Sequence, residues 1–159
     1  MRDRFYPREK QCMSLKVYLA GRITRQEEVR TILTQLREAG LEVTRDWTWT
    51  TAITNEQEAG AFRKRDYTEL NPKYHTEADE CLNAVLEADV FIILSDENGS
   101  GMYVEMGAAF AAHKIRNKPR LLYAIGPHFD RMLFYQHQTI QRVKSVEEVL
   151  GDLRKRSLL

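Results

Sequence analysis

Residues 89–112 read DVFIILSDENGSGMYVEMGAAFAA, and this stretch decides the fold. An apolar segment, Asp89 to Leu94, precedes a turn rich in glycine and serine at 98–101, and an apolar helical run at 102–112 follows. A strand, a glycine turn and a helix in this order are typical of an α/β unit, in which ligands bind at the carboxyl ends of parallel strands. We therefore expect an α/β domain with its functional site at that edge of the sheet.

Glu105 is the only charged residue in the helical run 102–112. A helix that is apolar all round is normally buried, and a buried carboxylate is costly unless a cation or a donor meets it. Glu105 therefore either has a hidden partner or faces a cleft where its charge is used. The start of a helix favours an anion, because the helix dipole and the unpaired N–H groups point there.

Strand and helix patterns alternate along the rest of the chain. Strands are predicted at 15–20, 41–47, 89–94, 120–125 and 139–143. Helices are predicted after capping boxes at 24–27 and 145–148, from Thr76 as cap to Ala88, and within 60–70. Gly40 is expected to end the first helix, and Asn71-Pro72 to break the chain. The pattern predicts one α/β domain over 14–159 with a parallel sheet, after a flexible tail at 1–13.

The bulk composition bounds the class of protein. A chain of 159 residues fits one domain, and its net charge of +1 argues against a nucleic acid polymer as partner. No apolar run approaches the ~20 residues of a membrane span, and the amino terminus lacks a signal-peptide core, so we expect a cytoplasmic protein. Cys12 and Cys81 are too few for a disulfide framework, and the histidines lack metal-ligand spacing, so neither metal nor cofactor is expected.

The turn after the third predicted strand is a candidate ligand site. It is not a dinucleotide fingerprint, because Val104 stands where the third glycine belongs. Its N–H groups could cradle a phosphate or hydroxyl; the alternative is a plain helix cap with Ser100 as N-cap. The candidate binding residues here are Asp96, Asn98, Gly99, Ser100, Gly101 and Met102.

Other candidates follow the first two strands and open the Thr76 helix. Arg22 follows Gly21 and could clamp an anion, or could be a solvated loop residue. Asp46 and Trp47 end the second strand; Trp47 and Trp49 could form a stacking wall for a base, or could serve core or dimer packing. Glu77, Asp79 and Glu80 could supply a second carboxylate for acid–base work, or could be solvated acids at a helix start.

Several of these segments resemble the nucleoside 2-deoxyribosyltransferase superfamily, which includes the 2'-deoxynucleoside 5'-monophosphate N-hydrolases. The resemblance runs through KVYLAG at 16–21, EADVFIIL at 87–94, GMYVEMG at 101–107 and residues 108–114, and it covers about 15–143. It implies a flavodoxin-like (Rossmann-like) three-layer sandwich of about five parallel strands in order 2-1-3-4-5. It also implies a homodimer or higher oligomer in which a neighbouring subunit completes the site.

The resemblance also implies roles for particular residues. Glu105 matches the family nucleophile, which attacks the anomeric carbon and forms a covalent glycosyl intermediate. Tyr18 matches a tyrosine near the nucleophile, and Gly21 and Ile23 match a loop that touches the ligand. Gly99 and Cys81 stand where family members carry acids, so Asp79, Glu80, Asp96 or Asn98 would have to substitute.

The implied function is cleavage or transfer at the N-glycosidic bond of a nucleoside or nucleoside 5'-monophosphate. Two alternatives stay open: a non-catalytic nucleotide-binding or sensor domain, and a hydrolase of an NAD-type glycosidic bond. Arg22, the amides of 99–101 and the helix start favour a 5'-monophosphate. The apolar loop from Phe129 to Gln136 predicts contact with a partner subunit.

Overall fold

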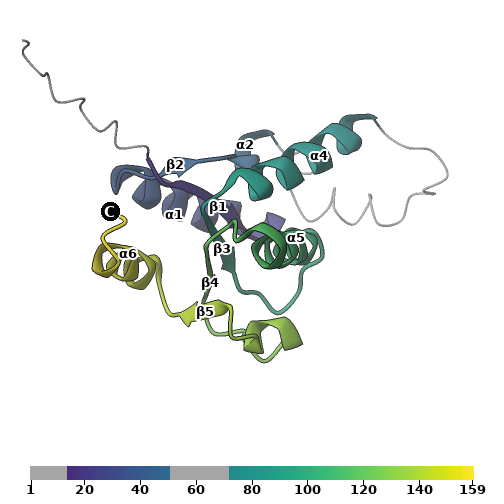
Figure 1. The fold of residues 1–159 in the computed structure, drawn as a ribbon. Helices are drawn as coiled ribbons and strands as arrows, with labels where there is room; N and C mark the ends of the chain where they lie inside the picture. The colour runs from purple at the N-terminus through teal and green to yellow at the C-terminus, as the bar shows by residue number, and fades with distance from the viewer. Residues whose placement is uncertain (1–13, 51–71) are drawn as a thin grey trace, which may run out of the picture.

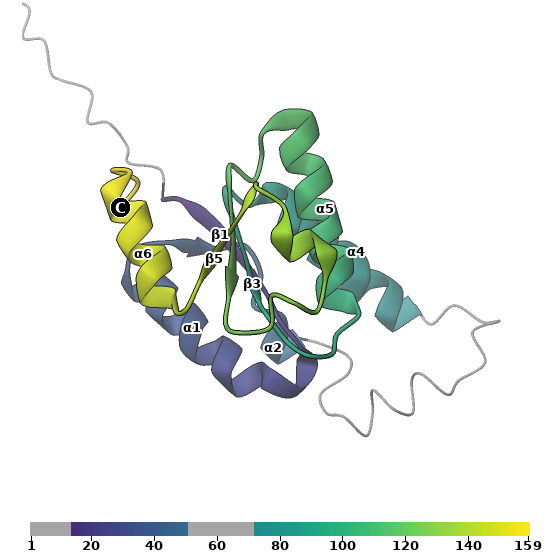
Figure 2. The ribbon, with the colours of Figure 1, turned by 90° about the horizontal axis from the view of Figure 1, so that it is seen from below.

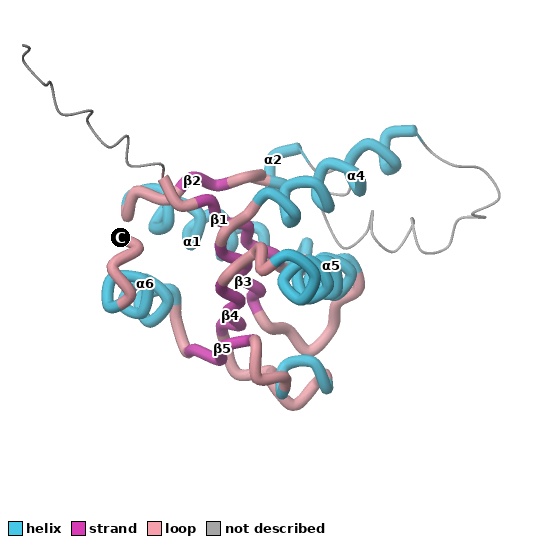
Figure 3. Tube along the Cα trace, in the orientation of Figure 1, coloured by secondary structure: helices cyan, strands magenta, loops and turns pink. Residues whose placement is uncertain are grey.

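Five parallel strands form one sheet in the order β2-β1-β3-β4-β5, which confirms the predicted flavodoxin-like α/β fold (Figure 1 and Figure 3). The computed structural model describes residues 14–50 and 72–159. The predicted tail at 1–13 and helix within 60–70 lie outside this range. The strands are β1 (Lys16–Ala20), β2 (Glu42–Val43), β3 (Val90–Leu94), β4 (Leu121–Ile125) and β5 (Ile140–Val143).

Helices cover both faces of the sheet. Figure 1 and Figure 2 show α1 and α6 on one face and α4 and α5 on the other. The longer helices are α1 (Gln26–Glu38), α4 (Pro72–Glu87), α5 (Gly101–Arg116) and α6 (Val146–Lys155). Short elements complete the set: η1 (Ile23–Arg25), α2 (Trp47–Thr50) and η2 (Leu133–Gln136). No helix in the described part of the chain has the length and apolar character needed to cross a membrane.

The core lies on both faces of the central strands. All five residues of β3 are buried, as an apolar strand covered on both faces should be. The helices contribute one apolar stripe each: Val29, Ile32, Leu33 and Leu36 from α1, and Val146, Val149, Leu150 and Leu153 from α6. Gly40 adopts φ +92° just past α1, which confirms it as the predicted helix stop.

The second strand is shorter than predicted. Pairing with β1 stops at Val43, and the predicted strand end at 44–47 turns into α2. The cause is Asp46, whose Oδ1 accepts hydrogen bonds from the Thr48 hydroxyl at 2.6 Å and the Thr48 amide at 3.2 Å. Such a short-range side-chain bond competes with strand pairing and favours a helix start.

Two predicted helix caps are wrong. Thr24 lies inside η1, and α1 begins only at Gln26, with Arg25 as N-cap. Helix α4 begins at Pro72, so Thr76 lies within the helix and does not cap it. Proline suits the first turn of a helix, where its missing N–H has no partner to lose. Pro72 therefore opens a helix where the sequence predicted a break.

Helix α5 is not buried all round. Met102, Met106, Ala109 and Ala112 face the core, whereas Val104 is 63% exposed and Ile115 is 84% exposed. The helix thus presents one apolar stripe to the sheet and a second to the surface. Glu105 lies between them and is partly buried.

Candidate active site

Glu105 has a direct partner on the central sheet. The Tyr18 hydroxyl donates a hydrogen bond of 2.7 Å to Glu105 Oε1. Tyr18 belongs to β1, is fully buried and stacks on Phe91 of β3, with ring centroids 6.2 Å apart. Burial, and then the charge of Glu105, raise the pKa of Tyr18 well above its ordinary value. The phenol therefore stays protonated and acts as a fixed donor toward the carboxylate.

The surroundings of Glu105 favour its protonated form. Burial raises the pKa of Glu105 from 4.5 to about 7, while hydrogen bonds from Tyr18 and Cys81 act in the opposite direction. A carboxylate of this kind is half ionised near neutral pH and is weakly solvated. These are the properties of a group that acts as a nucleophile or a proton carrier, because each form is populated under working conditions.

A second group of side chains extends the site through α4. Cys81 of α4 is half-buried and packs against the core, and burial, and then the charge of Glu105, raise the pKa of its thiol above the ordinary value. Arg45, in the loop after β2, forms ion pairs with Glu77 at 2.8 Å and Glu80 at 2.5 Å. The sequence presented Cys81 only as a missing acid and did not single out Arg45. Neither belongs to a local motif, and α4 packs against α5 and β1, the elements that carry Glu105 and Tyr18.

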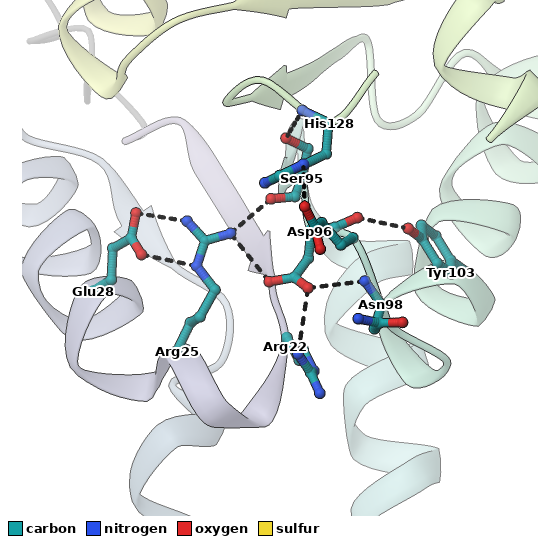
Figure 4. A network of polar contacts seen from close by, with 9 residues as sticks. Arg22, Arg25, Glu28, Ser95, Asp96, Asn98, Tyr103 and His128 are labelled. Carbon is teal, nitrogen blue, oxygen red and sulfur yellow. Dashed lines mark hydrogen bonds and ion pairs between the residues drawn. The ribbon is translucent and has the colours of Figure 1, made fainter. Parts of the chain in front are cut away.

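The carboxyl edge of the sheet carries a charged network around Asp96, which Figure 4 shows. Asp96 is buried, forms ion pairs with Arg22 at 3.5 Å and Arg25 at 3.3 Å, and accepts a hydrogen bond from the Asn98 amide at 2.9 Å. Arg25 also donates to the Ser95 carbonyl at 2.6 Å. Asp96 is therefore an acceptor held by two guanidinium groups and a backbone amide.

The network joins loops that follow three strands. Arg22 and Arg25 follow β1, Asp96 follows β3, and the His128 amide, after β4, donates to Ser95 Oγ at 3.3 Å. The Tyr103 hydroxyl donates to the Asp96 carbonyl at 3.3 Å, which ties the start of α5 to the same network. The network lies where the order β2-β1-β3-β4-β5 reverses direction between β1 and β3, the usual ligand position in such sheets.

The other predicted residues separate into two groups. The first group lies at this carboxyl edge: Gly21, Arg22, Asn98, Gly99 and Ser100 are in loops, Ile23 is the first residue of η1, and Gly101 is the first residue of α5. Ser100 is the N-cap of α5 by position, but its side chain makes no capping hydrogen bond. Met102 is buried in the core, which leaves packing as its visible role.

Three predicted residues have structural partners away from Glu105. Trp47 is buried and its indole N–H donates to the Leu19 carbonyl at 2.9 Å, so the core-packing alternative holds. Asp46 starts α2 and pairs with Arg37 at 2.8 Å. Asp79 is exposed on α4, and the contact described for it is a 3.5 Å hydrogen bond from Asn83.

Within residues 14–50 and 72–159, no group of three or more His, Cys, Asp or Glu side chains is placed to hold a metal ion. No protein-family model and no curated protein matches the chain. Among solved structures, the chain is similar to the CMP N-glycosidase BcmB of Clostridium botulinum, with 19% identity and a TM-score of 0.47. The match covers 88% of this chain and 98% of that one.

Proposed function

We propose that the chain cleaves or transfers at the N-glycosidic bond of a nucleoside or nucleoside 5'-monophosphate through a covalent intermediate on Glu105. The observation that carries the proposal is the 2.7 Å hydrogen bond from Tyr18 to a partly buried Glu105 at the ligand-binding edge of a parallel sheet. It supports the role that the sequence resemblance implied for both residues.

The chemistry follows the pattern of retaining glycosidases. One carboxylate oxygen of Glu105 attacks the anomeric carbon, and the C–N bond breaks with its electron pair leaving on the base. The base takes up a proton, and the sugar remains as an ester on Glu105. Water, or a second base, then attacks the same carbon and regenerates the carboxylate. Tyr18 holds Oε1, so the carboxylate is oriented before the substrate arrives.

The experiment for this mechanism compares Glu105→Gln and Glu105→Ala with the wild type. Purified protein is incubated with a panel of nucleosides, nucleoside 5'-monophosphates and NAD, and free base is measured by chromatography. We expect base release in the wild type and its loss in both variants, with intact mass showing a sugar adduct on the wild type alone. Glu97→Gln, on the exposed β3–α5 loop, is the matched control. Turnover that survives in Glu105→Gln would refute the nucleophile, and binding without base release would favour the sensor alternative.

A 5'-monophosphate is the substrate class that we favour. Arg22 and Arg25 bring two guanidinium groups to the carboxyl edge, and the first turn of α5 follows the loop that holds Asp96. A phosphate can share these donors with Asp96. Glu105 lies four residues beyond Gly101, or about 6 Å along the helix axis, which suits a sugar bridging phosphate and nucleophile.

Calorimetry with a matched nucleoside and monophosphate tests the phosphate site. We expect Arg22→Ala to weaken monophosphate binding by about 1.5–3 kcal/mol, typical of a charge-assisted hydrogen bond, and to leave nucleoside binding nearly unchanged. Equal affinity of the wild type for both ligands would rule out this role for Arg22.

We further propose a homodimer through the outer face of α5 and η2. Four large apolar side chains are exposed there: Val104 (63%) and Ile115 (84%) on α5, and Leu133 (80%) and Phe134 (52%) on η2. The rings of Phe110 and Phe134 lie 6.2 Å apart, so η2 packs beside α5. Tyr135, by contrast, is fully buried, so only part of the predicted loop faces outward. Light scattering should show a dimer for the wild type and a monomer for Ile115→Glu. A wild type that is monomeric at micromolar concentration contradicts the proposal.

A further inference from the structure

Arg25 lies between α1 and the β3–α5 loop, as Figure 4 shows. Its guanidinium donates four hydrogen bonds: to the two Glu28 carboxylate oxygens at 2.8 Å each, to the Ser95 carbonyl at 2.6 Å and to Asp96 Oδ2 at 3.3 Å. A guanidinium presents its donors in a rigid planar fork, so acceptors bound at its two ends are held at a fixed separation. Arg25 therefore ties α1 to the β3–α5 loop, and most of its donors are already committed within the protein.

The two carboxylate oxygens of Asp96 face different partners. Oδ2 accepts from Arg25, whereas Oδ1 accepts from the Asn98 amide at 2.9 Å and pairs with the Arg22 guanidinium at 3.5 Å. Arg22 and the turn that follows Asn98 are the donors that the proposed function assigns to a phosphate. Arg25 thus fixes one oxygen of Asp96, and the other oxygen gathers the groups that we expect to contact the ligand.

Arg25 is itself held at both ends of its fork. Glu28 lies three residues further on, in the first turn of α1, and binds the guanidinium through both carboxylate oxygens. Such bidentate geometry restricts the orientation of the guanidinium, even where a half-exposed ion pair contributes little to stability. At the other end, Ser95 is fully buried and its amide donates to the Ile125 carbonyl at 2.8 Å, so the acceptor belongs to backbone fixed by the sheet.

We propose that Arg25 is a positioning residue. Held by Glu28, it keeps Asp96 and the β3–α5 loop in the conformation that brings Arg22 and the Asn98 turn to the ligand, and it does not contact the ligand itself. This inference rests on the proposed function, which assigns Arg22 and this turn to a phosphate. The two arginines then differ in role: Arg25 supplies geometry, and Arg22 supplies charge.

Two substitutions separate a geometric role from direct contact. Arg25→Lys keeps the positive charge, but a single ammonium group cannot span Glu28 and the Ser95 carbonyl as the fork does. Direct attraction of a phosphate would survive this change, whereas positioning would be lost. Glu28→Gln removes a negative charge bound to Arg25, which by charge alone would strengthen the binding of a nearby anion. Loss of the bidentate pair should weaken that binding instead, so the two roles predict opposite signs.

Amide hydrogen exchange measures the loop without any ligand. The Asn98 amide is the reporter, because it donates to Asp96 Oδ1. We expect it to exchange about 3–10-fold faster in Arg25→Lys and in Glu28→Gln, while the amides of β3 keep their rates. Glu27→Gln, in the same turn of α1 and with a side chain that is 95% exposed, is the matched control and should change neither. An unchanged Asn98 rate, or an equal acceleration throughout β3, overturns the inference.

Titration with inorganic phosphate, followed by NMR of the same amides, supplies the second readout. We expect the dissociation constant of phosphate to rise about 5–20-fold in Arg25→Lys and about 2–5-fold in Glu28→Gln. Phosphate binding that is kept in Arg25→Lys, or is unchanged or tighter in Glu28→Gln, overturns the inference in favour of direct contact. Glu28→Gln decides the question alone if Arg25→Lys does not fold. A wild type that binds no phosphate, with the Asn98 amide exchanging faster in both variants, supports the positioning of the loop and rejects the proposed phosphate site.

Discussion

Replacement of Glu105 by glutamine should make the protein more stable at alkaline pH. Glutamine resembles the protonated carboxyl, so the variant removes the cost of ionising Glu105 within the fold. The pKa of Glu105 is raised by burial to about 7, against an ordinary value of 4.5. The folded state therefore holds the proton more tightly than the unfolded state does. The wild type has its full stability below pH 4.5 and loses part of it as the pH rises through about 7.

The magnitude follows from the difference between the two pKa values. A difference of 7 − 4.5 = 2.5 pKa units, at about 1.36 kcal/mol per unit, gives an upper bound of ~3.4 kcal/mol. Because Glu105 is partly exposed, we expect about 2–3 kcal/mol. For a domain of this size, that corresponds to roughly 4–12 °C in Tm.

Unfolding by urea or heat, followed by circular dichroism between pH 4 and 8.5, measures this effect. The stability difference between Glu105→Gln and the wild type should grow between pH 4.5 and 7 and reach a plateau above pH 8. Glu38→Gln, at an exposed site in α1, controls for the substitution itself. A difference that does not change with pH would mean that the folded protein compensates the Glu105 charge fully, and that Glu105 is not a high-energy carboxylate.

Three further predictions follow from the same contacts. Tyr18→Phe removes the 2.7 Å hydrogen bond, so the acidic limb of kcat/KM should move upward by about 1–2 pH units; an unmoved limb in a folded variant contradicts the donor role. Gly21→Ala places a Cβ 2.9 Å from Val29 Cγ2, and urea unfolding should show a loss of about 1–3 kcal/mol, whereas Gly151→Ala, with open space around it, should be neutral or stabilising. Among substituted pyrimidine or purine nucleotides, those whose leaving base is the weaker base should react faster, because Asp96 is held as a hydrogen-bond acceptor. A reaction rate that does not depend on the pKa of the leaving base would instead indicate an efficient general acid.

Much of the fold follows from short-range patterns. The apolar runs at 15–20, 89–94 and 120–125 matched β1, β3 and β4 closely, because buried parallel strands need continuous apolar residues. The predicted boundaries were wrong where a single residue and its local geometry decided where an element begins. Asp46 bonds Thr48 and starts α2 inside a predicted strand, and Pro72 opens α4 where a break was predicted. Such effects depend on the geometry of one residue and leave no periodic pattern in the sequence.

The candidate site likewise contains residues that a sequence pattern marks and residues that only the fold brings together. The Tyr18–Glu105 contact joins residues 87 positions apart, and it was anticipated because both were implied by one family pattern. Arg25 and Arg45 were not anticipated as site residues. Arg25 reaches Ser95 and Asp96 across the sheet edge, and Arg45 reaches α4 from the loop after β2. Arginines are common on surfaces, so only the fold distinguishes these two from solvated ones.

The fate of the proton on the leaving base is the step that the described side chains constrain most. Both carboxylate oxygens of Asp96 already face donors, Oδ1 the Arg22 guanidinium and the Asn98 amide and Oδ2 the Arg25 guanidinium, so Asp96 is placed as an acceptor. Asp79 is exposed, and helix geometry places it about 200° around α4 from Glu77, which pairs with Arg45.

In the proposed mechanism Glu105 must be ionised to attack the sugar, so it has no proton to give at that moment. Among the side chains of residues 14–50 and 72–159, two routes then remain. The base leaves with little assistance, or it takes its proton from Glu105 in the molecules where that carboxyl is protonated, which are unreactive as nucleophiles. The second route is self-defeating, because one carboxyl cannot be acid and nucleophile in the same step. Under the proposed mechanism we therefore expect a substrate whose base is already a good leaving group, with catalysis depending on the charge and orientation of Glu105.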